Sequence, residues 1–296
     1  MDYIGLMQNW IAAPPAPEVE GASARVHLRY EDVCQDGRLL LEVLPNALGS
    51  AVWGAQLSKE SVAKTCMEQG VIPILTRFVI EGAPGPFGVM TPLGVVGRFA
   101  LAQGDGRVYL NMWADLSGPI ARTYPPQPEN AGTIAPAGKI FGEHVFTRLF
   151  APPGERRVEK LDVPGVPDPL PEYAARPLAS LIEIPDGVRA LDDLSPDDSP
   201  ITFGLVHTDS NHHVNSLVYI RLFEEAALRA FAKLGRTEPL LARRLEIAYR
   251  KPCFTGDRMR IHVRVVEVEG RLGALAILAK EGDPSSAHVA SRLVFE

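Results

Sequence analysis

The stretch from Val214 to Gly235 restricts the possible folds of this chain more than any other segment. It predicts one long helix, with Gly235 suited to its C-terminal cap. Apolar residues occupy most faces of this helix: Val214, Leu217, Val218, Ile220, Leu222, Phe223, Ala226, Ala227, Ala230 and Phe231. A helix that is apolar around most of its circumference must be largely enclosed. We therefore expect an antiparallel sheet that curves around it.

Strand-like segments follow this helix. They cover residues 243–251, 258–265, 272–282 and 288–296. In the first segment, the apolar residues Leu245, Ile247 and Tyr249 alternate with Glu246, Ala248 and Arg250. This alternation is typical of a strand with one buried face.

The first half of the chain has a similar order of elements. Strand-like runs over residues 25–30 and 36–44 precede a buried helix expected over residues 46–70, although Gly49 and Gly54 lower its helix propensity. The strand-like segments that follow cover residues 71–82, 94–103, 107–118 and 139–151. Each half therefore predicts one long helix and an antiparallel sheet. The two sheets can pair edge to edge, which covers strand edges that promote aggregation when exposed.

With 296 residues, the chain exceeds the usual size of one domain. Residues 1–24 are expected to form a flexible N-terminal arm, because their second half is rich in small residues and proline. Residues 25–151 form the first predicted unit and residues 201–296 the second. Residues 152–200, rich in proline and acidic residues, are expected to be a connector that wraps the surface.

Composition excludes several classes of protein. The formal net charge of −6 argues against a protein that mainly binds nucleic-acid phosphates. No apolar run is long enough for a membrane span, and the N-terminal segment lacks the positive region of a secretory signal, so we expect a cytoplasmic protein. Cys34, Cys66 and Cys253 are widely separated, which indicates neither a disulfide framework nor a cysteine zinc site.

Titratable and amide side chains gather at the expected strand-to-helix junction. Asp209, Asn211, His213, Asn215 and Tyr219 form the pattern D-x-N-x-H-V-N-x-x-x-Y, and an aromatic-Glu-Glu-Ala run follows in the helix. This pattern resembles that of the hot-dog-fold thioesterases. It is most similar to the second half of the acyl-ACP thioesterases, in which one chain contains two hot-dog units.

This resemblance implies an α+β fold of the double hot-dog type, each unit having a long central helix wrapped by a curved antiparallel sheet. It implies hydrolysis of a fatty- or polyketide-type thioester of acyl carrier protein or coenzyme A, without a metal or other cofactor. The chain would be a monomeric pseudo-dimer or a homodimer. The first unit would house the acyl chain, where Trp53, Leu57 and Met67 are candidates to set the tunnel depth.

The resemblance also implies roles for single residues. Asp209 would be the catalytic carboxylate, Asn211 its polar partner and His213 a third member of the site, with Asn215, Tyr219 and Cys253 in support. A carboxylate can activate water or attack the thioester carbonyl directly. The free amides at the helix start, those of Val214, Asn215 and Ser216, can polarise the carbonyl.

One position departs from the family pattern. The acyl-ACP thioesterases carry a glutamate before the cysteine, whereas this chain has Pro252 before Cys253. The loss of this acid leaves open a dehydratase, isomerase or cyclase acting on a carrier-bound acyl chain. A non-catalytic module that binds an acyl chain or acyl carrier protein is a further alternative.

Structural explanations compete with these roles. Asp209, Ser210 or Asn211 could simply cap the helix. Cys253 could be a buried apolar residue, and Glu224 and Glu225 could form a solvated edge or line the interface of the units. A metal cluster is a weaker interpretation of four neighbouring residues, His207, Asp209, His212 and His213. A solvated face or a landing patch for a phosphopantetheine-bearing partner could explain Arg250, Lys251, Arg258, Arg260 and Arg264.

Overall fold

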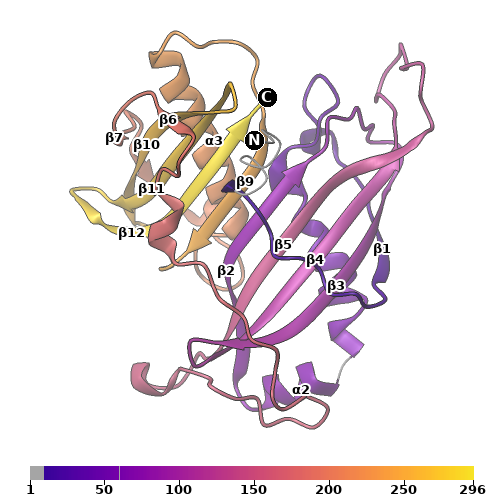
Figure 1. The fold of residues 1–296 in the computed structure, drawn as a ribbon, viewed down its shortest axis with the longest axis vertical. Helices are drawn as coiled ribbons and strands as arrows, with labels where there is room; N and C mark the ends of the chain where they lie inside the picture. Colours follow the sequence, from indigo (N-terminus) through magenta and orange to yellow (C-terminus); the bar gives the residue numbers. More distant parts are fainter. Residues whose placement is uncertain (1–9, 60) are drawn as a thin grey trace.

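A computed structural model describes residues 10–59 and 61–296 of the chain. Its strands form one antiparallel sheet that runs through both halves, in the order β1-β3-β4-β5-β2-β9-β12-β11-β10-β6 (Figure 1). The strands of the first half are β1 (Ala22–Val26), β2 (Val71–Gly82), β3 (Leu93–Gly104), β4 (Arg107–Pro119) and β5 (Ile134–Arg148). Those of the second half are β6 (Val188–Ala190), β7 (Ser195–Pro196), β8 (Ile201–Thr202), β9 (Ala242–Tyr249), β10 (Arg258–Val268), β11 (Arg271–Lys280) and β12 (Asp283–Phe295). The short β7 and β8 also pair with β10.

The two halves meet where β2 pairs with β9. The register runs from Arg77 opposite Ala248 to Glu81 opposite Arg244. This antiparallel ladder confirms the expected edge-to-edge pairing of the two sheets.

The long helix of the second half is α3 (Ser216–Lys233). Asn215 caps its start, because the Asn215 side chain accepts a hydrogen bond from the Leu217 amide at 2.8 Å. Gly235, at φ +76°, follows its end, as the sequence predicts. Its buried face packs on β10 and β11, and the residues buried there are Tyr219, Ile220, Phe223, Ala226, Ala227 and Phe231. None of the described helices is both long and apolar enough to span a membrane.

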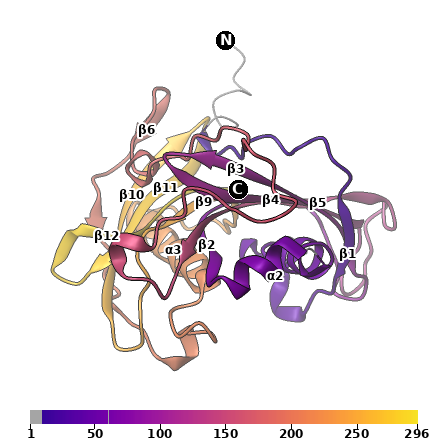
Figure 2. The ribbon, with the colours of Figure 1, turned by 90° about the horizontal axis from the view of Figure 1, so that it is seen from below.

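The prediction of one long helix in the first half is wrong. The segment divides into the π-helical turn η3 (Leu48–Gly54), the 3-10 turn η4 (Leu57–Lys59) and the short helix α2 (Ser61–Glu68). Glycine at both ends of η3 explains the break, together with the close contact of η3 with β3. A Cβ added at Gly97 of β3 would lie only 2.7 Å from the Cβ of Ala51. Figure 2 shows α2 and α3 on the same side of the sheet.

Residues 36–44 also differ from the prediction, which was a strand. They contain the 3-10 turn η2 (Leu41–Val43), and Leu39 makes only an isolated bridge to Val33. Leu41 and Val43 are buried in the core beside the helices. The expected strand is therefore wrong, because the backbone of this buried apolar run is a turn.

The N-terminal arm is packed rather than loosely attached from Trp10 onward. Trp10 and Ile11 are 3% and 4% exposed and join an apolar cluster with Val79 and Phe141. The arm then crosses the sheet as far as β1, which begins inside the range assigned to the arm. Residues 1–9 lie outside the described residues.

The connector covers the same face of the sheet. It contains the 3-10 turns η5 (Pro153–Glu155) and η6 (Leu178–Leu181) and the edge strands β6 and β7. Leu181 is fully buried against Ala248 and Ala290. The sheet is therefore covered by helices on one face and by the arm and connector on the other.

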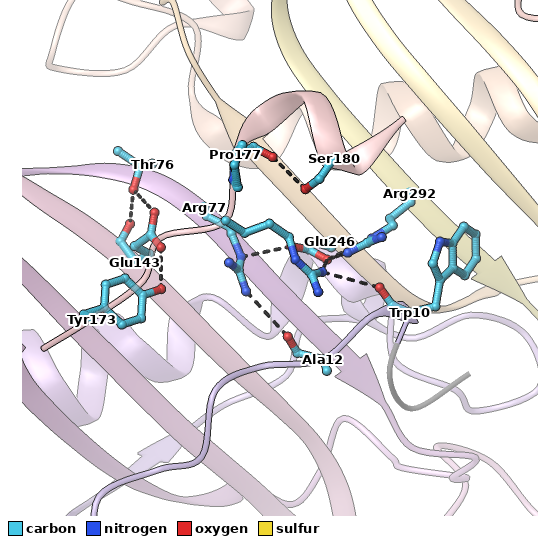
Figure 3. Close-up of polar contacts among 11 residues, drawn as sticks. Trp10, Ala12, Thr76, Arg77, Glu143, Tyr173, Pro177, Ser180, Glu246 and Arg292 are labelled. Atoms are coloured by element: carbon cyan, nitrogen blue, oxygen red, sulfur yellow. Dashed lines mark hydrogen bonds and ion pairs between the residues drawn. The ribbon is translucent and has the colours of Figure 1, made fainter. Parts of the chain in front are cut away.

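A buried ionic network lies under the arm and the connector (Figure 3). Glu246 of β9 has no exposed surface and lies 3.0 Å from Arg77 of β2, 2.7 Å from Arg176 of the connector and 2.9 Å from Arg292 of β12. Arg77 and Arg176 also reach the carbonyls of Ala12 and Trp10, each at 3.5 Å. One carboxylate therefore connects both units, the connector and the arm.

Replacing Glu246 with glutamine should destabilise the protein by about 3–5 kcal/mol, because it leaves buried guanidinium groups without a countercharge. Glu267→Gln is the matched control, because Glu267 is a strand residue whose pair with Arg189 is in contact with solvent, and it should cost under about 1 kcal/mol. Denaturant unfolding of both variants measures the difference. Equal, small losses would show that the network contributes little.

Candidate active site

The loop that carries the predicted motif turns back sharply before α3. Thr208 and Val214 form an isolated antiparallel bridge, and the Asp209 amide donates to the His213 carbonyl at 3.2 Å. His212 adopts the left-handed conformation, at φ +64°. A non-glycine residue in this region is uncommon and accompanies tight turns.

Asp209 is half-buried, and both of its carboxylate oxygens accept hydrogen bonds. Oδ1 accepts from the Asn211 backbone amide at 2.8 Å, and Oδ2 accepts from the Asn215 side-chain amide at 3.2 Å. The side-chain partner of Asp209 is therefore Asn215, not Asn211 as the resemblance implied. The reason is the turn after Asp209, which brings the backbone of Asn211 to the carboxylate and leaves this residue exposed.

His213 is half-buried, and its Nδ1 lies 3.3 Å from the Val214 carbonyl. The hydrogen bond from the Asp209 amide to the His213 carbonyl holds the two residues close together. The described contacts do not join its ring to the Asp209 carboxylate.

Among the three amides expected to polarise a carbonyl, two are already engaged. The Val214 amide donates to the Cys253 carbonyl at 2.8 Å, and the Asn215 amide donates to the His207 carbonyl at 2.9 Å. These bonds tie the loop to neighbouring segments, so neither amide is available to a ligand. Within the described part of the chain, the Ser216 amide makes no hydrogen bond. It is the first residue of α3, where amides lack a partner within the helix.

Aromatic rings support this loop from below. The Tyr249 ring packs edge-on against Phe78 and tilted against Tyr219, with ring centroids 6.1 and 5.8 Å apart, and Tyr219 contacts Phe203 at 6.0 Å. The Tyr249 hydroxyl donates to the Ser216 carbonyl at 3.1 Å. This series of rings holds the first turn of α3 in place, so Tyr219 contributes through packing.

Cys253 is completely buried beside Tyr219 and His288. Burial raises the pKa of the Cys253 thiol to about 11, which keeps it protonated near neutral pH. A thiol is a weak nucleophile. Cys253 therefore fits the structural interpretation, with its carbonyl holding Val214.

A cleft of about 470 Å³ opens at the start of α3. One wall consists of Asn215, Ser216 and Leu217 of the second unit. The other wall belongs to the first unit and contains Pro45, Asn46, Leu48, Gly49, Ser50, Trp53, Phe78 and His144. Asp209 does not line the cleft, but its Oδ2 is bonded to Asn215, which does.

His144 of β5 is the cleft residue that sequence reasoning missed. It is 7% exposed, its Nδ1 has no hydrogen bond within the described residues, and its ring packs edge-on against Trp53 at 5.7 Å. Burial lowers the pKa of His144 to about 4, so the imidazole is neutral at pH 7. A signal was present, because strand alternation places His144 on the apolar face of β5 with Ile140 and Phe146.

The three residues expected to set the tunnel depth do not lie together in the structure. Trp53 lines the cleft. Leu57 lies in the apolar core, and Met67 is 70% exposed. Only Trp53 is therefore placed to contact a ligand in this cleft.

The sequence allowed two interpretations for several charged side chains, and their contacts in the structure bear on this choice. Arg258 and Arg260 share one ion-pair partner, Glu281, at 3.0 Å each, so this strand face keeps part of its positive charge. Glu225 is exposed, but the Oε1 atom of Glu224 is buried without a hydrogen-bond partner in the described residues. Glu224 therefore belongs to the interface with the first unit, near Glu42 of η2.

Comparisons with known proteins bear on the family and the fold of the chain. Residues 211–287 match the model of the thioesterase superfamily. This match contains the helix α3 and most of the strands around it. A comparison with curated proteins gave no match.

Solved structures extend the likeness to nearly the whole chain. A Bacteroides thetaiotaomicron acyl-ACP thioesterase is 17% identical, with a TM-score of 0.57, covering 93% of this chain and 97% of the other. The 12:0-ACP thioesterase of Umbellularia californica is 11% identical, with a TM-score of 0.53 and coverages of 93% and 96%. A Lactobacillus plantarum protein provisionally named an oleoyl thioesterase is 14% identical, with a TM-score of 0.61 and coverages of 94% and 97%.

The chain shares the fold of the acyl-ACP thioesterases. The resemblance inferred from the motif is thereby confirmed, as is the large antiparallel sheet of a hot-dog architecture. At these identities the likeness to solved structures concerns the fold alone.

Glu224 gives the stability of the protein a pH dependence that can be measured. Burial raises the pKa of Glu224 to about 8, and Glu42 acts in the same direction. The unfolded state releases this proton near pH 4.5, so the folded state loses stability as pH rises from 4.5 to 8. Glu224→Gln should therefore stabilise the protein at pH 9 by on the order of 2–4 kcal/mol and change little at pH 4.

Glu225→Gln is the matched control, because it alters the neighbouring exposed carboxyl. Thermal or denaturant unfolding at both pH values measures the effect. An equal response of the two variants at pH 9 would contradict the buried position of Glu224.

Proposed function

We propose that this protein is an acyl thioesterase that hydrolyses a fatty- or polyketide-type thioester of acyl carrier protein or coenzyme A. The observation that carries the proposal is the free Ser216 amide at the start of α3, which lies in a cleft with both polar and apolar lining, beside the hydrogen-bonded pair Asp209 and Asn215. The amide can polarise a carbonyl, and the carboxylate can serve as a base. Leu48, Trp53 and Phe78 provide apolar surface for an acyl chain.

The reaction follows from these groups. Water adds to the thioester carbonyl carbon and gives up a proton to Asp209, while the carbonyl oxygen becomes an oxyanion. The Ser216 amide and the N-terminal end of α3 stabilise this negative charge. The carbon–sulfur bond then breaks, and Asp209 returns the proton to the leaving thiolate, which yields a carboxylic acid and a free thiol. No metal or redox cofactor enters these steps.

The supporting residues act through position. Asn215 holds Asp209 and caps α3, so one side chain aligns the base with the free amide. Both units are contained in one chain, which fits a monomeric pseudo-dimer or a homodimer acting in the cytoplasm. We place His213 and Asn211 in the loop that shapes the turn around Asp209.

Asp209→Asn should reduce kcat by about 10²–10⁴-fold, because the amide cannot accept the proton of water. The assay is thiol release from a series of acyl-CoA and acyl-ACP substrates of different chain length, with mass spectrometry of the acyl product. Asp257→Asn, which alters a turn outside the cleft, is the control. The proposal is overturned if no thioester is cleaved, or if the acyl chain loses water while the thioester stays intact.

Asn215 allows its structural and functional roles to be separated. Asn215→Asp keeps the cap of α3, since a carboxylate also accepts from the Leu217 amide, but places a like charge beside Asp209. Asn215→Ala removes the cap as well. The first variant should retain wild-type stability within about 1 kcal/mol and lose most of its activity, and the second should lose activity and about 1 kcal/mol of stability. Full activity of Asn215→Asp would contradict the arrangement.

A further inference from the structure

His144 is a buried polar side chain on the wall of the cleft. It projects from β5 into the cleft, from the unit opposite the catalytic loop, and its Nδ1 lacks a hydrogen bond within the described residues. The backbone groups of Leu110 and Gly142 lie close enough to the ring to oppose the lowering of its pKa, but Nδ1 makes no hydrogen bond by distance and angle within the described residues. Burying a polar group without a partner costs free energy, so such groups in native proteins need an explanation.

The neighbouring residue shows that this strand can satisfy buried polar groups. Glu143, on the other face of β5, accepts hydrogen bonds from the hydroxyls of Thr76 at 2.7 Å and Tyr173 at 2.5 Å. His144 faces Trp53, whose ring edge restricts the orientation of the imidazole but provides no acceptor or donor contact. The unsatisfied group is therefore confined to the cleft side of the strand.

The position of the ring relates it to the proposed chemistry. His144 and Ser216 line the same cleft from different units, and Ser216 contributes the only unengaged amide among the three at the helix start. A neutral imidazole carries one N–H donor and can bond a carbonyl oxygen without bringing a charge into an apolar site. Pro252 offers no acid in the second unit, and its carbonyl contacts His288 at 3.2 Å, away from the cleft residues.

We infer that His144 is a catalytic residue contributed by the first unit, and that its N–H donates to the thioester carbonyl oxygen together with the Ser216 amide. This inference rests on the proposed thioesterase function. Two donors from opposite walls would hold the carbonyl between the units, with the acyl chain lying along Trp53 and Phe78. The negative charge that develops on oxygen strengthens both hydrogen bonds in the transition state.

The kinetic test uses the full-length protein and three variants. His144→Phe keeps a planar ring without a donor, and His144→Asn keeps an N–H donor. His27→Leu alters an exposed histidine of the same unit and serves as the control. We expect His144→Phe to lower kcat by about 10²-fold with KM changed by less than about 3-fold, and His144→Asn to recover at least about 10-fold of that loss.

A purely structural role for His144 predicts a different result. The Asn and Phe variants would then lose activity to the same extent, in parallel with their thermal stability. That result, or a kcat of His144→Phe within about 3-fold of the wild type, would overturn the inference while leaving the thioesterase function in place.

A binding measurement keeps the test independent of turnover. The probe is an acyl-coenzyme A analogue in which a difluoromethylene group replaces the thioester sulfur, so that the ketone adds water to form a tetrahedral adduct that resembles the transition state but cannot be cleaved. Wild-type protein should bind it about 10-fold more tightly than His144→Phe, with His144→Asn between them, as measured by calorimetry. Equal affinities, or no binding by the wild type, would overturn the role of His144. A difference in affinity without any thioester cleavage would instead count against hydrolysis and support the carbonyl contact.

Discussion

The ion pairs of Glu246 hold together the parts on which the cleft depends. This carboxylate contacts Arg77 of β2, Arg176 of the connector and Arg292 of β12, and it lies at the ladder where the two units meet. Arg77 and Phe78 are neighbours on β2 and point to opposite faces of the sheet. Fixing Arg77 on one face therefore also fixes Phe78, a wall of the cleft, on the other.

The candidate active site is shared between the units in a way that neither half could supply alone. The second unit provides Asp209, Asn215 and the free amide of Ser216 at the start of α3. The first unit provides apolar surface and the ring of His144, whose Nδ1 makes no hydrogen bond within the described residues. Joining both units in one chain allows the two walls of the cleft to differ, so that under the proposed function one would bind the acyl chain while the other is held beside the carboxylate.

Sequence reasoning located the motif but assigned some of its contacts to the wrong atoms. The pattern around Asp209 led to the thioesterase superfamily, and the match over residues 211–287 confirms it. The side-chain partner of the carboxylate is Asn215, while Asn211 contributes its backbone amide, and the Val214 amide is bonded to the Cys253 carbonyl. Such contacts depend on how a tight turn and a distant strand meet, and residue spacing does not specify this.

The sequence by itself determined the elements whose signal is local. The apolar circumference of α3, its glycine cap and the alternation along β9 depend on residues close together in the chain. Tertiary structure alone decided which faces are covered. Alternation placed Glu246 on the face expected to meet solvent, yet it is fully buried, because the arm and the connector lie across that face. Tertiary structure also decided that the helix expected in the first half breaks where η3 packs on Gly97, because close packing between distant segments outweighs local propensity.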